Sequence, residues 1–260
     1  MFIVFNKEKI YSYAIALSTI VILFIMASTI INRKDGIIAT SAPASKQLPV
    51  YSVDTKEKKI ALTMNCAWNA DDIDNILDTL SKNKIHITFF MVGDWVDKYP
   101  EYVKKIADNG HEIANHSNTH PHVNQLNVDK NMEEIKLCSE KIEKITGNKT
   151  TLYRGPYGEY NDTVINAANA KNHITIQWNL DTLDYTGLTG EEMWKRLDSK
   201  LSNGSIILSH NGTKHTADSL ELLLHNIKEK GYEVVTVSEL IYKDNYTIDA
   251  NGMQKQLKNE

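Results

Sequence analysis

The chain has 260 residues with a formal net charge of −4 at neutral pH, and 42% of its residues are hydrophobic. This composition is typical of a globular protein, and the length allows one α/β domain of roughly 200 residues together with a smaller appendage. Because acidic and basic side chains nearly balance, no strong field attracts the chain to nucleic acid, and we expect no nucleic-acid partner.

The N-terminal region contains a long apolar run. Residues 11–31 carry no charge, have basic residues on both sides, and are about long enough to cross a bilayer as a helix. A cleaved signal peptide is the alternative, but the run is long for such a peptide, and the only small-residue cleavage site, at residues 42–44, lies well beyond its end. We therefore expect an uncleaved signal-anchor, a single transmembrane helix that attaches the protein to the cell membrane with the large C-terminal domain outside the cytoplasm.

The chain beyond this region alternates between strand-like and helix-like segments. Short apolar, β-branched runs are each followed by an amphipathic helical stretch, in seven successive units. This alternation predicts parallel strands joined by crossover helices, arranged either as a barrel or as an open doubly wound sheet. The predicted strands are residues 59–64, 86–93, 111–116, 150–154, 174–178, 205–210 and 233–237.

Composition and periodicity also divide the chain into regions. The segment between the apolar run and the first strand has no periodicity and contains Gly, Pro and Ser, so it is predicted to be a linker. The predicted regions are a short tail (1–10), the transmembrane signal-anchor (11–31), the linker (32–57), the α/β domain (58–243) and a C-terminal tail (244–260). Neither a GxGxxG motif after the first strand nor a GxxxxGK[ST] motif occurs, so we expect no nucleotide ligand.

Polar residues that are suited to catalysis follow the predicted strands, at the point where each strand ends. They are Asn65, His116, His120, Arg154, Asp181 and His210. The carboxyl ends of parallel strands share one edge of the fold, which is the face on which parallel barrels build their active sites. Scattered structural polar residues have no reason to share that edge.

The most specific local pattern is "NHSNTHPH", in which His116 and His120 lie four residues apart after a strand and His122 follows two residues later. Neutral imidazoles at this spacing can converge on one zinc-type cation, and a carboxylate commonly completes such a site while one position stays open for water. Loop histidines that only make hydrogen bonds are the alternative. We favour the metal site because the pair follows a strand on the predicted active face.

The stretch "YRGPYG" is a turn, in which Pro156 and Gly158 fix the backbone and Arg154 offers a charged fork of donors. Alone it indicates only a turn with an arginine. On the same edge as the histidine pair, Arg154 is predicted to orient a carboxylate or an amide in the pocket. The backbone N–H after Pro156 is then a candidate oxyanion donor.

The stretches "QWNLDTLDY" and "ILSHN" place Trp178, Asp181 and Asp184 after one strand and His210 at the end of the next. A histidine paired with an aspartate is oriented and stabilised in its charged form, which suits a general acid that protonates a leaving amine. The alternative is a capping aspartate and a buried histidine at a strand end. The residues themselves leave both possibilities open.

These motifs, in this order, resemble those of the polysaccharide deacetylase family, also called the NodB-homology or carbohydrate esterase 4 family, over nearly all of residues 58–243. "HSNTH" is similar to its H-S/T-x-x-H metal pair, "RGPYG" to R-x-P-Y-G, "LDTLDY" to its aspartate motif and "ILSHN" to its acid-histidine motif. The resemblance implies a distorted (β/α)7 barrel. It also implies metal-dependent removal of acetyl groups from N-acetylglucosamine or N-acetylmuramic acid units in peptidoglycan or chitin-like polymers.

The resemblance implies a role for each matching residue. His116 and His120 would bind a divalent metal, zinc or cobalt, which would polarise the acetyl carbonyl and activate water. His210 would be the general acid with Asp181 as its partner, and Arg154 would face the catalytic base. The glycan would be contacted by Tyr157, Trp178 and Pro156.

The first motif departs from the family pattern T-F-D-D-G, because residues 63–67 read Thr-Met-Asn-Cys-Ala. The first aspartate of the pattern is the base and is replaced by Asn65, whose uncharged amide cannot accept a proton from water at neutral pH. The second aspartate is the third metal ligand, and Cys66 stands in its place. Catalysis therefore depends on what, if anything, replaces these two acids.

A subgroup often linked to sporulation has a longer first motif, T-F-D-x-A-W-G, with acids a few residues later. "NCAWNADD" is similar to this form, so the resemblance implies Asp71, or less favourably Asp72, as the third metal ligand. Asp72 has an alternative role as the N-cap of the following helix, and Asp71 as a solvated loop acid. A Cys66 thiolate ligand is chemically feasible but less favoured.

Two functions are consistent with these residues. The first is a membrane-anchored deacetylase of N-acetylated cell-wall glycan, with activity reduced by Asn65. The second is a catalytically inactive glycan-binding or scaffold protein at the cell envelope, which the loss of the base favours. A different metal-dependent amidohydrolase on a parallel barrel is remote, because three family motifs occur in the family's order.

Overall fold

The computed structural model describes residues 11, 16–25 and 46–257. They belong to two units, which are divided between residues 45 and 46. In the first unit, residues 16–25 are helical. Several predicted regions lie outside the described residues. They are the N-terminal tail (1–10), about half of the expected transmembrane segment, more than half of the linker, and the alternative cleavage site (42–44). Within the residues that are described, no helix combines the length and apolar character needed to span a bilayer.

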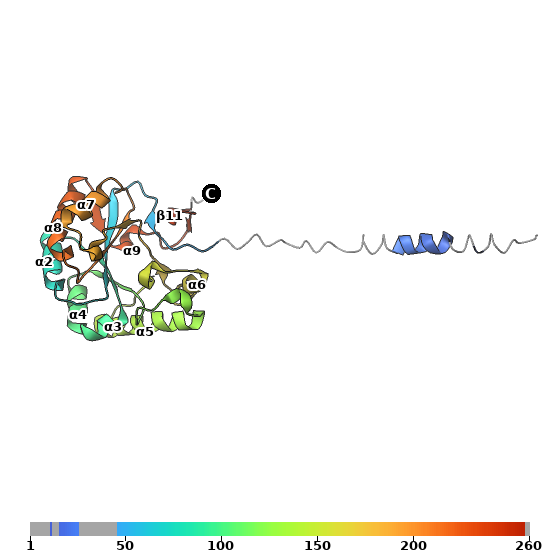
Figure 1. Cartoon of the computed structure of the whole chain (residues 1–260), viewed down its shortest axis with the longest axis horizontal. Helices are drawn as coiled ribbons and strands as arrows, with labels where there is room; N and C mark the ends of the chain where they lie inside the picture. Colours follow the sequence, from blue (N-terminus) through green and yellow to red (C-terminus); the bar gives the residue numbers. More distant parts are fainter. Residues whose placement is uncertain (1–10, 12–15, 26–45, 258–260) are drawn as a thin grey trace, which may run out of the picture. The chain divides into compact units, whose positions relative to one another are not determined.

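The second unit is an α/β domain built on a parallel sheet (Figure 1). Among its described residues, eight strands form this sheet, in the order β6-β5-β4-β3-β2-β8-β7 with β9 paired to the start of β2. All of these pairings are parallel. The strands are β2 (Lys59–Cys66), β3 (Thr88–Met91), β4 (Glu112–Asn115), β5 (Leu152–Tyr153), β6 (Ile174–Thr175), β7 (Leu180–Asp181), β8 (Ile206–His210) and β9 (Glu233–Val235).

The fifth predicted strand, residues 174–178, is a strand only at residues 174–175 (β6), and a separate strand that was not predicted, β7, follows at residues 180–181. β6 and β7 pair with β5 and β8 and so lie at opposite ends of the hydrogen-bonded path, yet only residues 176–179 separate them along the chain. Seven strands laid flat would place the two ends about 29 Å apart, whereas the connecting backbone reaches at most about 18 Å. The sheet must therefore curve back on itself, which confirms the predicted parallel, barrel-like α/β fold.

Helices follow the strands as crossover connections, as the alternation predicts (Figure 1). The longest, α5, begins where the Asn127 side chain accepts the N–H of Lys130, and it ends at Gly147 with a φ of 74°. The helices are α2 (Ile73–Asn83), α3 (Gly93–Lys98), α4 (Pro100–Asp108), α5 (Val128–Thr146), α6 (Asp162–Ala170), α7 (Gly190–Asp198), α8 (Thr216–Glu229) and α9 (Val237–Leu240), with short 3-10 turns η1 (Val123–Gln125), η2 (Pro156–Gly158) and η3 (Asp184–Thr186).

A second, small sheet extends the domain beyond the predicted limits of 58 and 243. In it, β1 (Ser52–Val53) pairs in parallel with β11 (Met253–Gln256), which pairs antiparallel with β10 (Tyr246–Ile248). Gln254 is fully buried, and its side chain amide exchanges hydrogen bonds with the backbone N–H and carbonyl of Tyr242. The end of the expected linker and most of the expected C-terminal tail (244–260) are thus parts of the folded domain.

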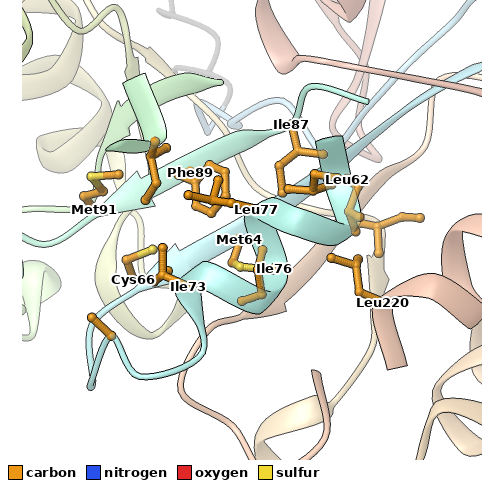
Figure 2. Close-up of a cluster of buried hydrophobic side chains, with 14 of the residues drawn as sticks. Leu62, Met64, Cys66, Ile73, Ile76, Leu77, Ile87, Phe89, Met91 and Leu220 are labelled. Carbon is orange, nitrogen blue, oxygen red and sulfur yellow. The ribbon is translucent and has the colours of Figure 1, made fainter. Parts of the chain in front are cut away.

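The core positions the site through the alternation of β2. Leu62, Met64 and Cys66 point to the face that packs against Ile73 and Ile76 of α2 (Figure 2). Because successive strand residues point to opposite faces, the side chains between them point the other way, into the barrel. The apolar face therefore fixes which β2 residues can reach the site.

His111, the residue just before β4, is a buried base that makes stability depend on pH. Burial, with a smaller contribution from His86, lowers the pKa of His111 from 6.5 to about 4. The unfolded chain binds this proton near pH 6.5 and the folded protein does not, so stability is lost as the pH falls from 6.5 towards 4.

We expect His111→Gln to remove this pH dependence, because a glutamine amide does not titrate between pH 7 and pH 4. Its side-chain oxygen can still accept the hydrogen bond that the Ile87 N–H donates to His111 Nδ1, so the local structure is kept. Between pH 7 and pH 4.5 the free energy of unfolding should fall by about 2 kcal/mol more in the wild type than in the variant. Urea denaturation at the two pH values measures this difference. Equal losses in both proteins would contradict the assignment.

Candidate active site

A cavity of about 600 Å³ lies at the carboxyl ends of the strands. Its lining includes seven residues that the sequence predicts for the site, namely Asn65, His116, His120, Tyr157, Trp178, Asp181 and His210. Arg154 and Pro156 are buried and do not line it. The lining is completed by Ala67, Trp68, Gly158, Tyr185 and Leu208. The shared edge of parallel strands thus brings most of the predicted residues together.

Asn65 is held against Arg154 at the base position. Arg154 Nη1 donates to Asn65 Oδ1 at 2.9 Å and to Thr63 Oγ1 at 2.9 Å, and Nη2 donates to the carbonyl of Gln177. Burial lowers the pKa of Arg154 to about 9, which leaves the guanidinium charged at neutral pH. A guanidinium has only donors, so it fixes the amide oxygen towards itself. The free end of Asn65 is then its NH₂ group, which cannot take a proton from water.

His116 and His120 lie together on the loop after β4, with ring centroids 5.1 Å apart. His116 Nδ1 donates to the carbonyl of Arg154 at 2.7 Å, so its Nε2 carries the free lone pair. Burial lowers the pKa of both histidines, which keeps the rings neutral at pH 7. The loop is fixed by Glu134, whose carboxylate accepts the backbone N–H groups of residues 118 and 119.

The candidates for a third metal ligand point elsewhere. Asp71 is exposed and does not line the cavity. The Asp72 carboxylate accepts the Gly212 N–H at 2.7 Å and a hydrogen bond from Asn211 Nδ2. It occupies the N-cap position of α2 without capping the helix. Cys66 is fully buried against α2, and this burial raises the pKa of its thiol.

This geometry corrects the expectation that Asp71 completes a metal site. No group of three His, Cys, Asp or Glu side chains in the described part of the chain is placed to hold a metal ion. The physical reason is that Asp72 ties the loop to the segment after β8, which leaves Asp71 in solvent. Two imidazoles alone do not fit the three-ligand metal centre that the family resemblance implies, and we derive no catalytic step from a metal.

The metal affinity of the full-length protein tests this conclusion. We expect excess zinc to raise the thermal midpoint of chelator-treated protein by no more than about 4 °C, equivalent to about 1 kcal/mol. Any rise should disappear in His120→Ala and persist in the matched control Asp71→Ala. A rise above about 10 °C that depends on Asp71 would show that this carboxylate does complete the site.

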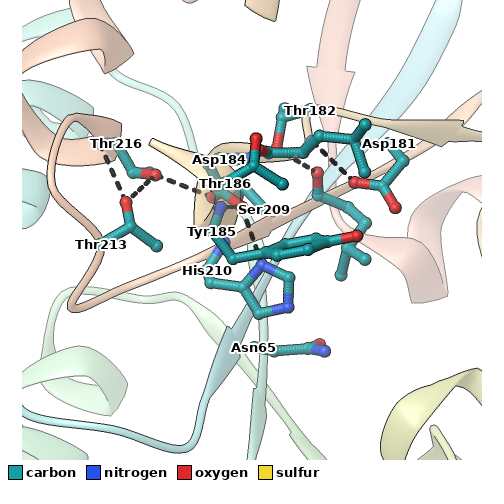
Figure 3. A network of polar contacts seen from close by, with 12 residues as sticks. Asn65, Asp181, Thr182, Asp184, Tyr185, Thr186, Ser209, His210, Thr213 and Thr216 are labelled. Carbon is teal, nitrogen blue, oxygen red and sulfur yellow. Dashed lines mark hydrogen bonds and ion pairs between the residues drawn. The ribbon is translucent and has the colours of Figure 1, made fainter. Parts of the chain in front are cut away.

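His210 is paired with Asp184 (Figure 3). His210 Nδ1 donates to Asp184 Oδ1 at 2.9 Å, and the buried carboxylate also accepts the backbone N–H of His210, the N–H of Tyr185 and the hydroxyl of Thr216. The donor at Nδ1 leaves Nε2 of His210 free. The ring is therefore oriented as a proton donor would need to be.

The predicted pairing of His210 with Asp181 is therefore wrong, and Asp184 takes that place. Its carboxylate accepts the N–H of Leu183 at 2.8 Å and lines the cavity instead of contacting the histidine. Leu183 has a φ of 54°, in the left-handed region, and this turn directs the next residue, Asp184, to His210. Asp181 holds the turn that positions the true partner.

Tyr157 forms one wall of the site. Its side chain is 61% exposed and packs against the rings of His120 and His122, with centroids 4.6 Å and 4.4 Å away. His122 Nδ1 donates a hydrogen bond to Glu159 Oε1 at 2.7 Å, so this ring is already engaged. Tyr157 and Trp178 both line the cavity, and their contacts with a glycan stay a prediction.

Two cavity residues, Trp68 and Tyr185, are missing from the predicted site. The Trp68 ring stacks on His210 with centroids 5.3 Å apart, and Tyr185 meets the same ring edge-on at 5.5 Å. Trp68 belongs to the stretch "NCAWNADD" and Tyr185 to "QWNLDTLDY". Their aromatic character beside motif residues was the available signal, but nothing in the pattern showed which way the side chains point.

Comparison with known proteins identifies the family of the chain. Residues 52–175 match the family model described as polysaccharide deacetylase. The chain is 36% identical over 193 residues to the uncharacterized protein YlxY of Bacillus subtilis, covering 74% of this chain and 60% of YlxY. It is 34% identical over 189 residues to the peptidoglycan-N-acetylmuramic acid deacetylase PdaC of B. subtilis, covering 73% of this chain and 40% of PdaC. The chain thus spans only about half the length of these relatives.

A solved structure is also similar. BA3943 of Bacillus anthracis, described as a CE4 family pseudoenzyme, matches with a TM-score of 0.72 and 30% identity over 80% of this chain and 70% of that chain. A mutant of BA3943 described as having restored enzymatic activity matches with the same TM-score. Together with the motifs and the cavity, these matches show that the chain belongs to the polysaccharide deacetylase family of hydrolases, carbohydrate esterase family 4.

Proposed function

We propose that the protein binds N-acetylated glycan of the bacterial cell wall in the cavity at the strand ends, and that it removes acetyl groups from this glycan only very slowly. The observation that carries this proposal is the contact between Asn65 and Arg154. Where a deacetylase needs a base to take a proton from water, this site presents an amide whose oxygen is already occupied. Loss of general base catalysis typically slows a reaction by about 10²–10⁴-fold.

The rest of the site supports glycan binding. His210 keeps its aspartate partner, and the cavity keeps aromatic side chains at its mouth. PdaC, a relative, is named for its action on peptidoglycan N-acetylmuramic acid, which supports peptidoglycan as the substrate class.

A second candidate function is binding without any turnover, as a glycan-binding or scaffold protein at the cell envelope. Two observations favour it. The histidine pair has no third ligand among the residues that the structure describes. In addition, BA3943, a structural relative, is described as a pseudoenzyme. The two candidates differ only in whether residual acetate release can be measured.

We also propose that residues 11–31 attach the protein to the cell membrane by a single pass, with the α/β domain outside the cytoplasm. The support is the uncharged apolar sequence and its basic flanks. Protease added to intact protoplasts should degrade the domain, and the protein should stay with the membrane after a high-salt wash. Protection of the domain, or its release by salt, would contradict this placement.

The proposed function is tested with the full-length protein and purified peptidoglycan, with zinc or cobalt in excess. We expect the protein to sediment with peptidoglycan, and acetate release to lie at least about 10²-fold below that of PdaC at equal concentration. Residual release that is abolished by His210→Ala favours slow catalysis, and no release favours binding alone. Failure to sediment would contradict glycan binding, and a rate close to that of PdaC would contradict the loss of the base.

A further inference from the structure

The loop between β2 and α2, residues 67–72, is fastened to the segment that follows β8. The backbone carbonyl of Asn69 accepts hydrogen bonds from Trp95 Nε1 at 3.1 Å and from Asn211 Nδ2 at 2.6 Å. Three residues along, the Asp72 carboxylate accepts the N–H of Gly212. The loop is therefore held at two points beside the strand end that carries His210.

This fastening places Trp68 over the site. Its ring lies on the face of His210, with 5.3 Å between centroids and 30° between planes, and it lines the cavity. Even so, 48% of the side chain remains exposed. An indole that stacks on one ring, lines a cavity and remains about half exposed offers an aromatic surface, and among the residues that the structure describes no second ring packs against it.

We propose that Trp68 is a glycan-binding residue, and that the pyranose ring of an N-acetylated hexosamine unit stacks on its open face. This inference rests on the proposed function, because it takes the cavity to be a glycan site. The C–H bonds on one face of a pyranose ring present weak positive charge, which suits the negative face of an indole. Because the loop is already fastened, binding costs little additional ordering of the side chain.

The geometry also separates Trp68 from a purely structural aromatic residue. A tryptophan that only completes the core is covered on all sides, as Trp95 is at 2% exposure. Trp68 contributes little to the core, so its removal should change affinity for the glycan much more than it changes stability. Trp194 on α7 is a matched control, because it is a partly buried tryptophan that packs beside Lys230 and does not line the cavity.

The test uses the full-length protein and a β-1,4-linked N-acetylglucosamine tetramer, titrated by calorimetry and followed by proton NMR of the sugar. We expect Trp68→Ala to weaken binding about tenfold or more, Trp68→Tyr to restore most of the loss, and Trp194→Ala to change little. Stacking should also shift the sugar-ring protons upfield through the indole ring current. That shift should be absent in Trp68→Ala.

Each outcome decides one claim. If the wild type does not bind the tetramer, both the proposed function and this inference fail. If the wild type binds and Trp68→Ala binds equally well, or the sugar protons show no upfield shift, only the role of Trp68 is overturned. If Trp68→Tyr is as weak as Trp68→Ala and both variants lose thermal stability, Trp68 has a structural role and the inference is wrong.

Discussion

Replacing Asn65 by aspartate is expected to increase acetate release from N-acetylglucosamine oligomers by about 10²–10⁴-fold, measured with zinc or cobalt in excess. The substitution is nearly isosteric and puts a carboxylate 2.9 Å from Arg154 Nη1, where a guanidinium is already in place to hold it. A carboxylate at this point can accept the proton that the amide cannot. Acetate is measured by a coupled enzymatic assay on the full-length protein.

Two variants serve as controls for this gain. Asn65→Leu has a similar volume and no proton acceptor, so it should show no increase. Asn65→Asp combined with His210→Ala should lose the increase, because the leaving amine then has no acid. If Asn65→Asp folds and binds glycan but releases no more acetate than the wild type, the missing base is not what limits this site, and the absent third ligand becomes the better explanation.

Replacing Asp184 by alanine is expected to lower the free energy of unfolding by about 3–5 kcal/mol. The Asp184 carboxylate is fully buried and accepts hydrogen bonds from His210, Tyr185 and Thr216, so its removal leaves several buried donors unpaired. Urea denaturation at pH 7 measures the loss.

The matched control is Asp181→Ala, three residues earlier. Asp181 is partly exposed, and among the described residues its carboxylate accepts a hydrogen bond only from the N–H of Leu183, so its loss should cost about 1 kcal/mol. The order of the two effects distinguishes the observed histidine partner from the one that the sequence predicts. A larger effect at Asp181 than at Asp184 would contradict the assignment.

The fold could be predicted where periodicity reflects burial. The apolar runs of β2, β3 and β8 are buried on both faces of a parallel sheet, and this burial requires the continuous hydrophobic sequence that identifies them. The strand β11 reads Met-Gln-Lys-Gln and β1 has only two residues. Such segments carry no periodic signal, because they form only when distant parts of the chain pair with them.

The site could be predicted where a strand end determines position. Asn65, His116 and His210 lie at the carboxyl ends of strands of one parallel sheet and meet at its edge for that reason. The errors arose in the loops. Leu183 has a left-handed backbone conformation, and as a result Asp184 contacts His210 where Asp181 was predicted to do so. The Asp72 carboxylate accepts a hydrogen bond from the N–H of Gly212, which is 140 residues away in the chain. Neither contact leaves a trace in local sequence.

The proposed function requires that the cavity hold N-acetylated glycan without cleaving it efficiently, and the fate of a bound oligomer tests this most directly. An N-acetylglucosamine tetramer is incubated with excess full-length protein and zinc, released by denaturation and weighed by mass spectrometry. We predict that, in the time that the Asn65→Asp variant needs to deacetylate its bound tetramer, the wild type binds the tetramer and leaves almost all of its acetyl groups in place. Equally fast deacetylation by the wild type would contradict this prediction, because a site with Asn65 at the base position would then be an efficient catalyst.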